Sequence, residues 1–172
     1  MVDGAARRAA IVDILTRESP VTGSALSSRL GVTRQVIVQD MAVLRAQGEQ
    51  IMATPRGYTL LRETPPAGVT KLIAVKHDRD NTRDELYTMV DLGAEVVDVT
   101  VEHPVYGQMT GQLALSSRSE VDEFLKTINA TNAGLLSSLT KGVHLHTIRC
   151  KTPAQLAAVE DALAKKGYLL SE

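Results

Sequence analysis

Apolar residues recur at helical spacing through the first third of the chain. In the most regular stretch, Ile37, Met41 and Leu44 fall on one face of a helix, with polar residues opposite. Two earlier segments keep the same period, and their expected core residues are Ile11, Ile14, Leu15, Leu26 and Leu30. The predicted helices cover residues 4–17, 22–30 and 33–45. This pattern indicates three helices packed around one small core.

A short strand pair is predicted after these helices. Gln47-Gly48 ends the third helix, and residues 50–61 form two apolar segments around Pro55-Arg56-Gly57. Proline before and glycine after a polar residue favour a tight turn, with Arg56 at its tip. Three helices followed by such a hairpin resemble the winged helix-turn-helix heads of bacterial transcriptional repressors, such as that of the biotin operon repressor.

The polar face of the third helix carries residue types that read duplex DNA. Gln35 and Gln39 can each bond bidentately to adenine when such a helix lies in the major groove. Thr33 suits the N-cap, Arg34 stands beside it where a phosphate would pass, and Arg56 completes the expected DNA-binding set. Any amphipathic helix has a polar face. The ordered set of helices, turn and hairpin is what favours DNA binding.

A linker is predicted at residues 62–68, where two prolines and a glycine neither extend a strand nor begin a helix. It would separate a domain of residues 1–62 from a second domain of residues 69–172. Charge also changes there, since residues 1–62 carry eight Lys or Arg against five Asp or Glu, and the rest carries eleven against fifteen. Only the first, mildly basic domain suits a phosphate partner.

Strand and helix periods alternate in the second domain. Val97, Val99 and Val101 alternate with polar residues, which is typical of a strand with one covered face. The whole order predicts an α+β sandwich: an antiparallel sheet with helices on one face, in the split βαβ or ferredoxin-like arrangement, and an extra C-terminal helix. The predicted strands are residues 71–76, 95–102, 108–115 and 143–149, and the predicted helices are residues 82–92, 119–129 and 153–166.

Three of the four histidines are expected to gather at one edge of this predicted sheet. With the first and fourth strands as central antiparallel neighbours, His77 at the end of one lies beside His144 at the start of the other. His146 leaves the same face as His144, roughly 7 Å further along the strand. Glu85 lies in the first turn of the helix that begins at this edge. These four side chains can surround one transition-metal ion, and zinc, nickel, iron and manganese all accept such ligands.

Simpler explanations exist for three of these ligands. A His-x-His pair on a strand is often just two solvent-facing polar residues, and Glu85 also fits a capping box with Thr82. The convergence of four ligands at one edge favours the metal site. His103 and Tyr106 lie in the hairpin between the second and third strands, also at this edge, and are expected to bind an effector.

Composition excludes several classes of protein. The single cysteine, Cys150, allows neither an intrachain disulfide nor a cysteine-based zinc finger. No apolar run is long enough to suggest a membrane span, and no signal peptide is indicated, so a cytoplasmic protein without a membrane partner is expected. With no Trp and one Phe, an aromatic platform for single strands is disfavoured. The expected nucleic-acid partner is double-stranded operator DNA.

The histidine motifs resemble those of the three-histidine (3H) domain. They read Val75-Lys76-His77-Asp78, His103-Pro104-Val105-Tyr106-Gly107 and Gly142-Val143-His144-Leu145-His146. A winged head joined to that domain resembles the NiaR-type, nicotinate-responsive repressors of bacterial NAD biosynthesis genes. The resemblance implies a homodimer that binds operator DNA when nicotinic acid, the co-repressor, occupies the second domain. It also implies a transition-metal ion at His77, Glu85, His144 and His146. Nothing in the spacing itself names nicotinate or NAD.

Two other functions stay open from the residues alone. In a metal-sensing regulator the ion itself is the signal, and the pyridine compound plays no part. In a metal-dependent enzyme the head would only target the protein to DNA, but Asp78 is the only nearby candidate for a separate general base.

Overall fold

The computed structural model describes residues 3–61 and 67–170. The chain divides into two compact units, residues 1–65 and 66–172. The predicted linker at residues 62–68 lies outside the described residues over 62–66. Among the residues on either side of that gap, no helix is long and apolar enough to cross a membrane.

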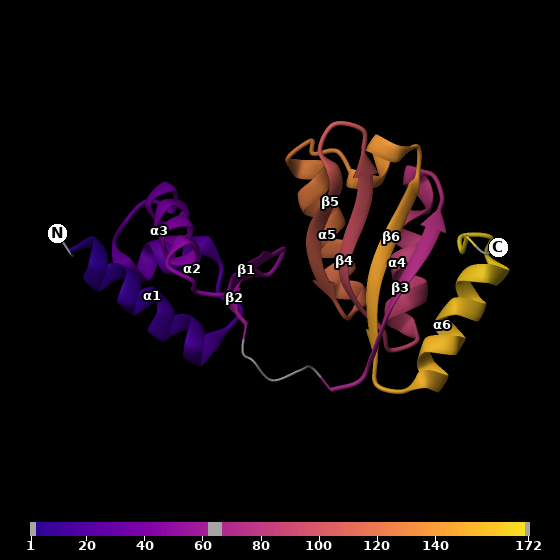
Figure 1. Ribbon diagram of the computed structural model, residues 1–172, viewed down its shortest axis with the longest axis horizontal. Coiled ribbons are helices and arrows are strands. Elements are labelled where there is room, and N and C mark those ends of the chain that lie inside the picture. The colour runs from indigo at the N-terminus through magenta and orange to yellow at the C-terminus, as the bar shows by residue number, and fades with distance from the viewer. Residues whose placement is uncertain (1–2, 62–66, 171–172) are drawn as a thin grey trace. The chain divides into compact units, whose positions relative to one another are not determined.

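The first unit is a trio of helices followed by a two-stranded antiparallel hairpin (Figure 1). Its elements are α1 (Gly4–Glu18), α2 (Gly23–Leu30), α3 (Arg34–Ala46), β1 (Ile51–Thr54) and β2 (Gly57–Leu60). The core includes Ile11, Leu15, Leu26, Ile37, Met41 and Leu44, all buried. Ile14 and Leu30, which the sequence places in the core, are only partly buried and pack against it. The winged helix-turn-helix expectation agrees with these elements.

The turn between α2 and α3 is short because both of its ends are capped. Gly31, at a φ of +65°, ends α2 in the left-handed conformation, which costs glycine little. Thr33 then begins α3 by accepting a hydrogen bond from the backbone N–H of Val36. These two residues hold α3 at its angle to α2.

A buried ion pair that the periodicity does not reveal ties α1 to α3. Asp40 is only 3% exposed and accepts hydrogen bonds from Arg7 and Arg8. At the helical period, Asp40 lies roughly 60° from Ile37, on the core side of α3. A charged residue is tolerated there because its partners lie on another helix. Arg7 and Arg8 therefore have a structural role in the head.

The second unit is a four-stranded sheet with three helices contributing to one core (Figure 1). The strands are β3 (Val69–Lys76), β4 (Glu95–His103), β5 (Gly107–Leu115) and β6 (Val143–Cys150). The helices are α4 (Thr82–Asp91), α5 (Arg118–Ala130) and α6 (Pro153–Lys165), with short 3-10 helices η1 (Arg79–Asn81) and η2 (Leu136–Thr140). All strands and helices expected from the sequence are present in the predicted order.

The strands are ordered β3-β6-β4-β5, and each neighbouring pair is antiparallel. The first and fourth strands of the unit, β3 and β6, are antiparallel neighbours as expected. The expectation that both are central is wrong, because β3 is the edge strand and only β6 lies inside the sheet. The ferredoxin-like arrangement is not confirmed. Element order along the chain does not determine strand order in space, because the connection after α5 is long enough for β6 to insert between β3 and β4.

One strand departs from simple alternation. The register between β4 and its neighbours shifts between Val96 and Asp98, so Val97 forms a β-bulge. Val96 is fully buried in its place, and Val101 is also buried. The expectation that Val97 shares the buried face with Val99 and Val101 is therefore wrong. A bulge adds one residue to a strand, and the face of every residue before it reverses.

Candidate functional site

Strand register brings the first two histidines of the site together. His144 pairs with Val75 in the β3–β6 ladder, and His77 follows β3 directly. His146 lies two residues further along β6, so both β6 imidazoles leave the same, covered face of the sheet. The side chains of all three histidines are at most 3% exposed.

Gly142 allows this close approach. A Cβ atom at this position would lie 2.1 Å from the carbonyl oxygen of His77, a distance that no side chain can occupy. Its φ of +90° is also a conformation that favours glycine. In return, the backbone N–H of His77 donates to the carbonyl of Gly142. The lack of a side chain at Gly142 therefore allows His77 to lie beside the start of β6.

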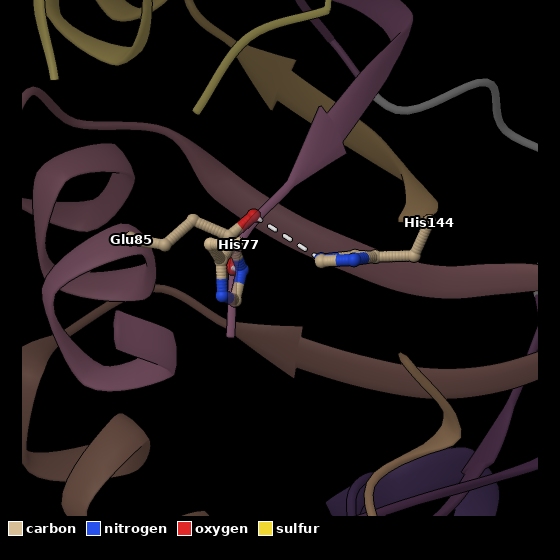
Figure 2. Close-up of side chains that lie close together, drawn as sticks. All are labelled: His77, Glu85 and His144. Carbon is tan, nitrogen blue, oxygen red and sulfur yellow. Dashed lines mark hydrogen bonds and ion pairs between the residues drawn. The ribbon is translucent and has the colours of Figure 1, made fainter. Parts of the chain in front are cut away.

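The fourth member is Glu85, which α4 carries to the same point (Figure 2). Its Oε2 lies 2.7 Å from Nε2 of His77. Its Oε1 lies 3.3 Å from Nε2 of His144 and 3.2 Å from Nε2 of His146. One buried carboxylate thus faces three imidazole nitrogens. His77, Glu85 and His144 form a group whose ligand atoms lie within 4.8 Å of one another and can hold a metal ion.

The other ring nitrogen of each histidine fixes which atom faces the carboxylate. Nδ1 of His77 contacts the carbonyl oxygen of Asp78 at 2.6 Å, Nδ1 of His144 that of Gly142 at 2.8 Å, and Nδ1 of His146 that of Asp98 at 2.7 Å. A carbonyl only accepts, so each Nδ1 must carry the hydrogen. Each neutral ring therefore presents an Nε2 lone pair toward Glu85. Metal-bound histidines are oriented by this kind of backbone contact.

The bulge in β4 serves this arrangement. Asp98 follows the bulged Val97, and its carbonyl accepts from His146 while its carboxylate accepts from the backbone N–H of Thr147. Bulges near functional sites commonly re-aim one residue in this way. Asp98 thereby holds the His146 ring from the neighbouring strand.

Acceptors that face acceptors need a cation between them. Among the described residues, Glu85 Oε1 and His146 Nε2 are buried without a hydrogen-bond partner. A proton or a metal ion removes this conflict, because either one places positive charge between nitrogen and oxygen. The donor set of three neutral imidazoles and one carboxylate fits a transition metal such as zinc. The residues present therefore fit the ion that the sequence pattern predicts.

The pKa values of these groups also show that the cluster favours positive charge between the imidazoles and the carboxylate. Burial lowers the pKa of His77 and His146, but Glu85 outweighs it, and both values lie above the ordinary one. Burial raises the pKa of Glu85, but His146 and the other facing imidazoles outweigh it and hold the value well below normal. Without metal, the cluster therefore takes up a proton more readily than free imidazoles do.

An apolar cavity of about 210 Å³ adjoins the cluster. His77, Glu85, His144 and His146 form part of its wall. Most of the remaining wall is apolar and comes from the sheet and from α4, α5 and η2; it includes Leu86, Val99, Leu113, Phe124, Ile128, Leu135 and Leu136. The polar cluster thus opens onto a space that suits a small, largely apolar ring.

The structure separates His103 and Tyr106 from this cavity. They lie around the β4–β5 turn, with ring centroids 5.1 Å apart, and neither lines the cavity. His103 Nδ1 accepts from the backbone N–H groups of Val105 and Tyr106, and so shapes the turn. Their effector role stays a prediction.

The capping box expected at the start of α4 is not formed. The N-cap is Asn81, and Thr82 already has helical backbone angles, because the 3-10 turn η1 leads directly into α4. Glu85 is thus free of the capping role that competed with metal binding. Ser117 and Thr152, by contrast, do act as N-caps of α5 and α6, since each hydroxyl accepts from the backbone N–H three residues on.

The expected DNA-binding residues lie at the surface of the first unit. Arg34, Gln35 and Gln39 on α3 and Arg56 at the hairpin turn are exposed. Thr33 is exposed as well, with its hydroxyl engaged as the N-cap of α3. Val38, 43% exposed, lies on the same accessible side of α3 and was not singled out from the sequence, because apolar residues are assigned to cores by default.

Comparison with known proteins matches both units. The HTH domain model matches residues 7–59, and the 3H domain model matches residues 70–172. The "Probable transcription repressor NiaR" of Thermotoga maritima is 44% identical over 167 residues, which are 96% of this chain and 94% of that protein. The chain belongs to the 3H-domain family of transcription repressors.

A second relative supports the same assignment. The "Transcription repressor NadR" of Bacillus subtilis is 40% identical over 157 residues, covering 90% of this repressor and 87% of the relative. Both relatives are named transcription repressors, so the chain is assigned as a repressor and the enzyme alternative is set aside.

Removing the β6 imidazoles tests the metal site. We expect the double variant His144→Ala, His146→Ala to fold and to lose its bound metal, because two of the four ligands are gone. Elemental analysis measures the metal, and circular dichroism checks the fold. His103→Ala, outside the cluster, is the matched control and should keep its metal. Equal metal content in both variants would contradict the site.

The pH dependence of stability gives a second test. The raised pKa values of His77 and His146 stabilise the metal-free repressor below the unfolded value of about 6.5, and this stability is lost as pH rises through the folded values. Metal needs the deprotonated rings, so stabilisation by added metal should grow over the same interval. Urea unfolding from about pH 6 to about pH 8, with chelator or with zinc, measures both trends. A metal-induced gain that shrinks as pH rises would contradict this assignment.

Proposed function

We propose that this repressor binds nicotinic acid as co-repressor, beside a transition-metal ion held by His77, Glu85, His144 and His146. The observation that carries the proposal is the buried cluster of one carboxylate and three Nε2 atoms on the wall of an apolar cavity. The names of the relatives support a role in repression. The resemblance to the 3H family suggests nicotinate as the effector and NAD biosynthesis genes as the regulated targets.

The cavity chemistry matches a pyridine carboxylate. The ion would supply a Lewis-acidic position for a carboxylate oxygen or ring nitrogen of the effector. Leu86, Phe124 and Leu135 provide the apolar wall for its ring. At about 210 Å³ the cavity is smaller than the roughly 300–1,000 Å³ of sites for drug-sized ligands, which suits a single small ring.

In this proposal the second unit senses the effector, and the first unit responds by binding DNA. We propose that the repressor acts as a homodimer whose two α3 helices read half-sites about one helical turn, roughly 34 Å, apart. Nicotinic acid binds one arrangement of the dimer better, and that arrangement matches the operator. The mechanism is a linkage between two ligands, so each must raise the affinity of the other by the same factor.

Crossed titrations test this linkage. With metal bound, we expect operator DNA to lower the Kd for nicotinate by about 5- to 150-fold, the usual range of allosteric coupling, and nicotinate to lower the Kd for operator equally. Calorimetry measures the first and gel shifts the second. A scrambled operator is the control. Equal nicotinate affinity with and without operator would refute the linkage, and loss of DNA binding on chelation with no effect of nicotinate would identify a metal sensor instead.

Variants of α3 test how DNA is read. Gln35→Ala and Gln39→Ala should lose discrimination between operator and scrambled DNA while keeping weak binding, because base contacts specify. Arg34→Ala should weaken binding to both DNAs alike and lower the salt dependence, because phosphate contacts do not depend on sequence. Competition gel shifts at several salt concentrations measure both effects. A uniform loss in all three variants would contradict these roles.

A further inference from the structure

Thr82 presents a buried hydroxyl that the site described so far does not use. The residue is 8% exposed, and its Oγ1 is buried without a hydrogen-bond partner among the described residues. Leaving a buried hydroxyl unpaired costs about 1–3 kcal/mol, so such groups are rare and call for an explanation. The capping role that would have satisfied it is absent, because Asn81 occupies the N-cap.

The unpaired hydroxyl belongs to the wall of the effector cavity. Thr82, Glu85 and His146 all line that cavity, and each has an unpaired buried polar atom. A metal ion satisfies the carboxylate and the imidazole but gives a neutral threonine hydroxyl no obvious partner, since such hydroxyls are not among the usual protein ligands of these ions. What the hydroxyl needs is an acceptor, and the ligand that fills the cavity is what can bring one.

The surroundings of Thr82 favour a negatively charged acceptor. Thr82 is the first residue of α4, a ten-residue helix whose N-terminus carries the positive end of the helix dipole. On its other side Thr82 lines a second, more polar cavity, to which Arg79, Asp80 and Arg83 contribute. The hydroxyl thus lies at the positive end of the α4 dipole, beside an apolar space suited to a ring.

We infer that Thr82 is a specificity-determining residue whose hydroxyl donates a hydrogen bond to the carboxylate of the effector. The inference rests on the proposed function, because it needs a pyridine carboxylate in the cavity. Thr82 distinguishes a charged effector from a neutral one and favours the acid over the amide, since a hydrogen bond to a charged acceptor is roughly twice as strong as one to a neutral acceptor.

The test is Thr82→Val, which keeps the shape of the side chain and removes the hydroxyl. In the full-length, metal-loaded repressor we expect nicotinate to bind roughly ten- to a hundredfold more weakly, with metal content unchanged. Binding of nicotinamide should fall less, so the preference for the acid over the amide shrinks. Thr82→Ser should restore most of the affinity. Calorimetry with each compound measures these values.

Thr88→Val is the matched control. Thr88 lies on the same helix and is equally buried at 8% exposure, but its hydroxyl donates to the carbonyl of Asp84 and it does not line the cavity. This variant should bind nicotinate as the wild type does. Thermal unfolding adds a second readout, because removing an unpaired hydroxyl should leave the melting temperature of the ligand-free protein unchanged or raise it. A hydroxyl that only supports the helix would lower it when lost.

The outcomes separate this inference from the proposed function. Failure of the wild type to bind nicotinate at any metal loading would overturn the proposed function. Nicotinate binding by the wild type, with equal affinity in Thr82→Val, would overturn the role of Thr82 and leave the proposed function standing. Equal losses for the acid and the amide would also overturn it, because the hydroxyl would then not read charge.

Discussion

The second unit is organised around one electrostatic conflict. The Glu85 carboxylate and the Nε2 atoms of the three histidines are all acceptors, yet each Nε2 lies 2.7 to 3.3 Å from a Glu85 oxygen in a buried site. Only positive charge between them makes this stable. The missing side chain at Gly142, the bulge before Asp98 and the start of α4 all serve to bring the four groups together. Much of the local backbone geometry therefore follows from one requirement for a cation.

The same requirement links the chemistry of the site to regulation. A cluster that can take a proton or a metal ion has a state that depends on pH and on the supply of metal. Because the cluster forms part of the wall of an apolar cavity, an organic ligand bound there would contact the cluster and the apolar surface together. Because that wall combines side chains of the sheet with others from α4, α5 and η2, a bound ligand contacts parts of the chain that are far apart in sequence. Such a ligand can favour one arrangement of the fold over another.

The periodicity of apolar residues was sufficient to predict the helices and strands, but it did not predict how they are ordered in space. Helix and strand positions agree closely with the structure because they depend on local spacing and on caps such as Thr33 and Thr152. The edge position of β3, the bulge at Val97 and the burial of Asp40 against Arg7 depend on contacts between distant segments. Local pattern carries no information on these. The capping box at Thr82 fails for a local reason, because the 3-10 turn η1 leads directly into α4 and makes Asn81 the N-cap.

The sequence by itself determined the ingredients of the site: a His-x-His on a strand, a histidine at the end of another, and a glutamate in the first turn of a helix. The sequence also predicted that these residues meet at one edge of the sheet. That prediction needed only the pairing of the first and fourth strands, which was expected correctly. Only the tertiary structure decided that the rings are buried, that backbone carbonyls fix Nε2 toward Glu85, and that a cavity with an unpaired Thr82 hydroxyl adjoins them. Burial and hydrogen-bond partners are properties of the packed fold, since each depends on atoms contributed by several elements at once.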